Sequence, residues 1–163
     1  MTRLLKAVPT GLLSPVYELR EGDAAIGSLE YRPLSLRQKG TITTAGQQFS
    51  VSREGVLSAN YLLVGQDGLV RATANRHGIT GTAFQVACGG FDVLLRKKIL
   101  ALRESYLLSD AGGEVGLVAR ESLVSRQMAI RLDERAAGMP AELILLLAWI
   151  AGMIHRSNDG SPA

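Results

Sequence analysis

The sequence predicts a mainly β fold, a closed antiparallel barrel of about 11–12 short strands wrapped around a buried hydrophobic C-terminal α-helix. Two observations carry this prediction. Short apolar runs separated by glycine-containing turns fill residues 15–132, and twelve consecutive apolar residues occupy 143–154. Hydrophobic residues make up 47% of the 163-residue chain, so it is long and apolar enough for one domain with a substantial core.

The expected domain division follows from where these runs begin and end. We expect a lead segment over residues 1–14, a single barrel domain over 15–156 with a central helix at about 140–156, and a flexible tail over 157–163. Lys6, Pro9 and Gly11 interrupt the apolar residues of the first segment, so it does not read as a secretory signal peptide.

Eleven runs have the length and the turn signals of strands, and their spacing is typical of a sandwich or a barrel. They span residues 16–20, 24–31, 41–44, 48–53, 56–64, 69–75, 82–87, 91–98, 104–110, 114–121 and 128–132. Phe49 and Val51 alternate with polar residues, as in a strand with one buried face. Asp67-Gly68 and Gly112-Gly113 predict hairpin turns, because glycine adopts a positive φ angle at little cost.

Two of the expected strands share a short pattern. Residues 25–30 read AIGSLE and residues 114–119 read EVGLVA, each with glycine in third place. Glycine inside a strand often marks a β-bulge or a bend. The match predicts either an internal repeat or a chance similarity, because six residues are too few to decide.

The apolar run at 143–154 has two interpretations, because a helix that is apolar on every face needs apolar surroundings. It is either a core helix or a membrane anchor that dimerises through Ala148 and Gly152. In a core, the same small residues would let strand side chains approach closely. Twelve residues span about 18 Å, against about 30 Å for the bilayer core. The length therefore favours a core helix, begun by Pro140 and ended near Arg156.

Four segments in this order carry a family resemblance: VYELREGDAAIGSLEYRPL at 16–34, DVLLRKK at 92–98, SYLLSDAGGEVGLVA at 105–119 and ELILLLAWIAGMIHR at 142–156. Over about residues 15–156 the chain resembles the shorter bacterial members of the tubby-like barrel superfamily, which includes tubby C-terminal domains, phospholipid scramblases and LURP-one-related proteins. The resemblance implies a barrel around a central hydrophobic helix and a phosphoinositide-type lipid site. No run of acidic calcium ligands is visible, so we expect no scramblase-type calcium role.

Basic residues are the candidate ligand-binding residues. The net charge of +3 is too small to argue for nucleic acid, but clustered Arg and Lys side chains at a barrel rim would suit an anionic lipid head group or a membrane surface. The candidates are Arg71, Arg76, Arg96, Lys97, Lys98 and Arg103. The alternative interpretation is that these side chains protect an edge strand from aggregation.

The expected function is therefore a non-enzymatic binding module, with a structural or protein-interaction scaffold as the alternative. No phosphate loop, GxSxG or HExxH motif occurs, so we expect no cofactor, no metal and no recognisable catalytic site. A pair formed by Cys88 and His77 is the one enzymatic alternative. A single cysteine fits a reducing cytoplasm, where the protein would attach peripherally to membranes.

Overall fold

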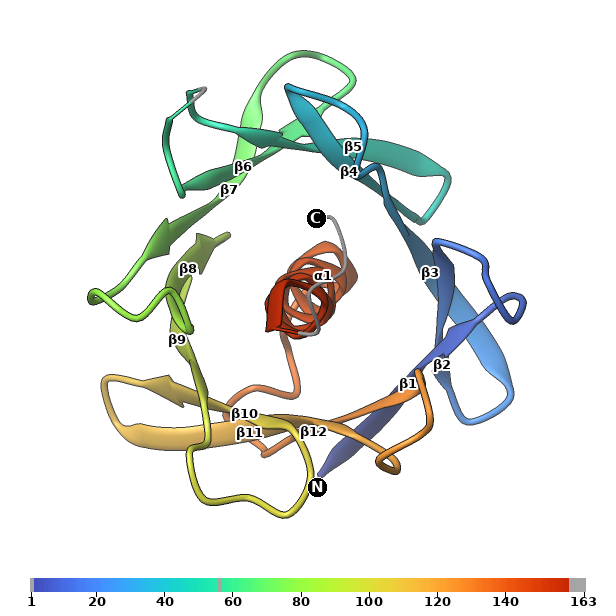
Figure 1. Cartoon of the computed structure of the whole chain (residues 1–163), viewed down its shortest axis with the longest axis vertical. Helices are drawn as coiled ribbons and strands as arrows, with labels where there is room; N and C mark the ends of the chain where they lie inside the picture. Colours follow the sequence, from blue (N-terminus) through green and yellow to red (C-terminus); the bar gives the residue numbers. More distant parts are fainter. Residues whose placement is uncertain (1, 56, 159–163) are drawn as a thin grey trace.

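The structure is a computed structural model that describes residues 2–55 and 57–158, and within them twelve antiparallel strands close into a barrel around one helix (Figure 1). The strands are β1 (Arg3–Pro9), β2 (Val16–Glu21), β3 (Ala24–Tyr31), β4 (Gln38–Thr44), β5 (Gln47–Arg53), β6 (Tyr61–Gly65), β7 (Val70–Arg76), β8 (Ala83–Cys88), β9 (Phe91–Lys97), β10 (Ser105–Asp110), β11 (Gly113–Arg120) and β12 (Met128–Leu132). The helix is α1 (Ala141–Asn158). The predicted fold class, a closed barrel with a C-terminal helix, is confirmed.

Strand β1 closes the barrel, because it pairs with β12 on one side and β2 on the other. The sequence analysis placed this strand in the lead segment, so the expected domain boundary at residue 15 is wrong: the barrel begins at Arg3. The Arg3 guanidinium also binds the Glu21 carboxylate at 2.8 Å and donates to the Met139 carbonyl at 3.2 Å. The start of the chain is thereby fixed to the segment that leads into the helix.

The barrel interior is the hydrophobic core, and α1 fills it (Figure 1). Leu143 to Ala151 are at most 2% exposed, although they cover every face of the helix. Phe49 and Val51 point inward as predicted. No helix in the described ranges combines the length and hydropathy needed to cross a membrane. The helix runs two residues past its expected end at 156, and the rest of the expected tail, 159–163, lies outside the described residues.

Bulky side chains of the barrel wall pack against the small residues of the helix, as the core interpretation requires. A Cβ atom added to Gly152 would lie only 2.1 Å from the Tyr31 hydroxyl oxygen. That hydroxyl donates to the Trp149 carbonyl at 3.0 Å, and the Tyr31 ring stacks on Trp149 with centroids 5.6 Å apart. Tyr31 is buried at this contact, and its burial raises the pKa of the hydroxyl well above its usual range. The helix lies closest to β3 and β4.

The barrel consists of three copies of a four-strand unit, β1–β4, β5–β8 and β9–β12. Inward-facing residues recur at intervals of 44 or 45 positions, and the second strand of each unit begins its buried face with Tyr17, Tyr61 or Tyr106. The third strands are each bulged at Ile26, Arg71 or Val115. The glycine pattern shared by 25–30 and 114–119 thus occupies equivalent bulges and reflects an internal repeat.

The two ends of the barrel differ, because antiparallel strands connect alternately at each end. One end, here called the turn end, has the short connections 22–23, 45–46, 66–69, 89–90 and 111–112, and the helix enters there. The other, the loop end, has the six longer connections 10–15, 32–37, 54–60, 77–82, 98–104 and 121–127. The last turns of α1 reach the loop end, so any site beside them is built from loops and strand ends.

Candidate ligand-binding site

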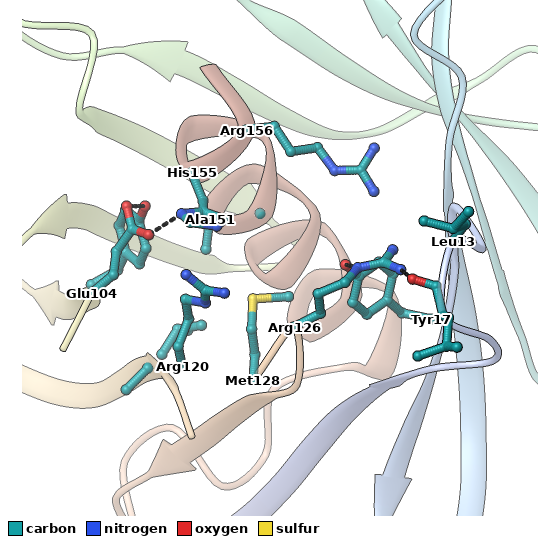
Figure 2. Close-up of a pocket in the computed structure, with 14 residues that line it drawn as sticks. Leu13, Tyr17, Glu104, Arg120, Arg126, Met128, Ala151, His155 and Arg156 are labelled. Atoms are coloured by element: carbon teal, nitrogen blue, oxygen red, sulfur yellow. Dashed lines mark hydrogen bonds and ion pairs between the residues drawn. The ribbon is translucent and has the colours of Figure 1, made fainter. Parts of the chain in front are cut away.

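A cavity of about 370 Å³ opens at the loop end, between the last turns of α1 and the ends of β11 and β12. Arg120, Arg126 and Arg156 supply its cationic side chains, and Figure 2 shows them on different sides of the space. Met128 and Ala151 line its apolar part. This volume lies in the range of small-molecule sites, and an apolar floor with a few polar groups is typical of them.

Arg126 is held rigidly in place by the neighbouring loop. Its Nη2 donates to the Ser14 carbonyl at 2.5 Å, its Nη1 to the Leu12 carbonyl at 2.5 Å, and its Nε to the Tyr17 hydroxyl at 3.2 Å. The guanidinium also lies 5.3 Å from the Tyr17 ring centroid. Arg126 therefore joins loop 121–127 to loop 10–15 and places a fixed positive charge at the cavity wall.

Arg120 and Arg156 keep donors available for a ligand. The Nε of Arg120 donates to the Ser125 carbonyl at 2.9 Å, which orients the group. The Arg156 guanidinium lies 4.1 Å from the Tyr31 ring centroid and has no side-chain hydrogen bond within the described residues. Nor does any described carboxylate pair with Arg120, Arg126 or Arg156. Because guanidinium stays charged, the cavity carries uncompensated positive charge.

One carboxylate, Glu104, also lines the cavity, but it is already paired with groups other than the three arginines. Its Oε1 accepts from the Tyr106 hydroxyl at 2.8 Å and pairs with Lys97 Nζ at 2.9 Å, and its Oε2 pairs with His155. Burial pushes the pKa of Glu104 upward, yet the hydrogen bonds from Lys97 and Tyr106 and the nearby charges outweigh it, so the net pKa lies below its ordinary value.

This lowered pKa predicts a pH-dependent contribution to stability. A carboxylate with a lowered pKa in the folded state stabilises the fold above its unfolded value of 4.5, and that contribution is lost as pH falls through the folded pKa. We expect wild type to exceed Glu104→Gln in denaturant stability at neutral pH, and the difference to narrow below about pH 4.5. Glu114→Gln, at an exposed position, is the matched control. A difference that stays constant with pH would contradict the assignment.

A second, smaller hollow of about 40 Å³ adjoins the cavity and shares Arg156 with it. Arg53 and Lys39 line it, and the Arg53 Nε is buried without a hydrogen-bond partner in the described residues. Burial first, and then the Arg53 charge, lower the pKa of Lys39. Both hollows therefore present cationic donors, with Arg156 between them.

The structure does not gather the six predicted residues into one site. Arg71 lies near the turn end and pairs with Asp67, and Arg96 faces outward from β9. Arg96, like the other four, lies at the loop end. There Arg76 donates to the Ile79 carbonyl, Arg103 donates to the Glu121 carbonyl, Lys97 pairs with Glu104, and Lys98 is exposed. Lys97 contacts the lining of the cavity through its ion pair with Glu104.

Sequence reasoning missed Arg120 and Arg126, and it treated Arg156 only as a helix end. The signal that would have found them is topological, because the end of β11, the loop before β12 and the end of α1 all lie at the loop end. The alternative pair of Cys88 and His77 is not formed, because Cys88 ends β8 at the turn end and His77 follows β7 at the loop end. Burial raises the pKa of the Cys88 thiol, which disfavours the reactive thiolate.

Fold and cavity together define a closed β-barrel with a central helix and a basic site at its loop end. Comparison with known proteins finds no matching family model, no similar curated protein and no significantly similar solved structure.

Proposed function

We propose that this protein is a non-enzymatic binding module for the anionic head group of a phospholipid, of the phosphoinositide type, at a membrane surface. The observation that carries the proposal is the set of three guanidinium groups, Arg120, Arg126 and Arg156, around a cavity of about 370 Å³ with no carboxylate partner in the described residues.

The chemistry of the lining suits a phosphorylated head group. Guanidinium presents N–H donors in a planar fork that matches two phosphate oxygens, and such charge-assisted hydrogen bonds are stronger than neutral ones. Arg126 is already oriented by three carbonyls and a tyrosine, so ligand binding would cost little conformational entropy at this side chain. The apolar floor near Met128 and Ala151 would face the less polar part of the same lipid.

The order of elements supports the same proposal. A closed twelve-strand barrel whose central helix comes last in the chain is the arrangement that the tubby-like resemblance implies. Membership of that superfamily is part of the proposal, and the lipid-binding residues proposed here come from the cavity of this chain.

The test measures the affinity of a soluble inositol phosphate by titration calorimetry. It compares wild type with the double variant Arg120→Gln, Arg156→Gln. We expect the variant to bind at least about tenfold more weakly, since each lost charged hydrogen bond contributes about 1.5–3 kcal/mol. Arg71→Gln, at the far end of the barrel and paired with Asp67, is the control and should bind as wild type does. Equal affinity in all three proteins, or affinity that ignores salt, would refute the proposal.

A further inference from the structure

Exposed large aliphatic side chains are concentrated at the loop end of the barrel. Eleven of them, on all six loops, are 73–99% exposed. They are Leu12, Leu13, Leu34, Leu36, Leu57, Ile79, Ile99, Leu100, Leu102, Leu123 and Val124. We call this set the aliphatic tips.

The rest of the described surface is different. Only three other large hydrophobic side chains are exposed on it, Leu4, Leu69 and Val70, and each is 51–59% exposed. Single exposed apolar residues are normal on a protein surface, but a concentration at one end marks an interaction surface. The tips are not needed to fill the core, because the helix and the inward-facing strand residues already do so.

Charge is concentrated at the same end. Counting the six loops, two residues of each adjoining strand and the last turn of the helix, the loop end holds twelve of the eighteen lysines and arginines, but only four described acidic residues. The four are Glu30, Glu54, Glu104 and Glu121. The barrel is therefore positive at the loop end and negative towards the turn end, although its net charge is only +3.

We propose that the loop end is a membrane-inserting face: the aliphatic tips enter the boundary between head groups and acyl chains of an anionic bilayer, and the basic residues among them contact lipid phosphates. This inference rests on the proposed function for its choice of partner, and it adds the surface, the depth and the orientation of binding. The barrel would stand with its loop end down, so that the arginine-lined cavity opens onto the lipid head groups.

A bilayer fits this surface better than a protein partner does. The tips are distributed over six separate loops around the rim, and none of the eleven is aromatic, whereas protein interfaces centre on clustered Tyr, Trp and Arg anchors. Aliphatic side chains combined with lysine and arginine are the composition of interfacial membrane attachment. Anionic lipid attracts each nearby basic residue, so the charge of the loop end complements the leaflet.

The first experiment measures depth at single positions of the full-length protein. With Cys88 replaced by Ala, an environment-sensitive fluorophore is attached to Leu57→Cys, Leu100→Cys or Leu123→Cys, and to Leu69→Cys at the turn end as the matched control. Vesicles of phosphatidylcholine with phosphatidylserine and a phosphoinositide should shift the emission of the three tip labels to the blue, and brominated acyl chains should quench them. The Leu69 label should stay unchanged. Equal responses at both ends, or none at the tips, would overturn the proposal.

The second experiment measures affinity for the same vesicles. The triple variant Leu57→Ser, Leu100→Ser, Leu123→Ser should lose at least about tenfold in partitioning, since insertion scales with buried apolar area. The pair Leu69→Ser, Val70→Ser should lose little, and both variants should keep the wild-type melting temperature, because the replaced side chains are exposed. Unchanged partitioning of the triple variant would overturn the proposal, as would sedimentation showing that it merely dissociates an oligomer or a protein complex.

Soluble inositol phosphate separates this inference from the proposed function. If the triple serine variant binds inositol phosphate as wild type does but no longer partitions into vesicles, both proposals stand. Normal insertion of the tips without any inositol phosphate binding would refute the cavity assignment and leave the inserting face intact. If wild type binds inositol phosphate but its aliphatic tips do not insert, the inserting face is refuted and the cavity assignment stands.

Discussion

Leu146→Asp is expected to destabilise the barrel by more than about 4 kcal/mol, which is a large share of the stability of an ordinary domain. Leu146 lies in the second turn of α1 and is 0% exposed. An aspartate there would bury either an unpaired charge or an unsatisfied carboxyl group inside an apolar barrel. Because all twelve strands share the one core, we expect global unfolding, measured by circular dichroism in denaturant, with little soluble protein on expression.

Two controls separate this effect from a general sensitivity of the chain. Leu146→Met keeps the volume and should cost less than about 1.5 kcal/mol. Leu57→Asp places the same charge on a side chain that is 99% exposed and should leave the denaturation midpoint near wild type. A folded, soluble Leu146→Asp protein with wild-type stability would show that the helix does not form the core.

Gly40→Ala is expected to cost about 2–3 kcal/mol, although alanine is ordinarily the better residue in a strand interior. Its Cβ atom would lie 2.3 Å from Trp149 Nε1 and 2.6 Å from the Glu30 carbonyl oxygen. The carbonyl belongs to the paired strand β3 and the indole is packed against two tyrosines, so neither has room to move. At Gly40, therefore, a helix side chain packs directly against the backbone of the barrel wall.

Trp149 makes this prediction easy to measure, because it is the one tryptophan in the sequence and is 2% exposed. Gly40→Ala should shift its fluorescence emission as well as lower the denaturation midpoint. Gly138→Ala, whose added Cβ has no neighbour nearer than 4.0 Å, is the matched control and should change neither. If both alanine variants behave alike, the close approach at Gly40 is not a constraint.

The sequence predicted the helix and eleven of the twelve strands because each leaves a local signal. The apolar run revealed α1, and alternation with glycine turns revealed the hairpins, including the positive φ angles of Gly68 and Gly113. Strand β1 was missed because residues 1–14 were examined only as a possible signal peptide and then placed outside the barrel, although Leu5 and Ala7 point inward while Leu4 and Lys6 point outward. A strand that pairs with the far end of the chain has no hairpin turn on one side to mark it.

The candidate site left no comparable local signal. Arg120, Arg126 and Arg156 come from a strand end, a loop and the helix, and only the closed register brings them to one cavity. A sequence shows that a residue is basic, but its hydrogen-bond partners depend on the fold. Arg103 and Arg76 look equally suitable in the sequence, yet neither lines the cavity.

The helix lies closer to one side of a threefold-repeated barrel, and this explains the position of the arginine-lined cavity. The wall repeats every four strands, so each unit could in principle leave the same space beside its tyrosine. A single helix cannot follow threefold symmetry, and α1 leans on β3 and β4, where Tyr31 and Tyr61 close around Trp149. The space next to Tyr106 in the third unit is left open. The proposed binding site thus results from the broken symmetry that the position of the helix creates.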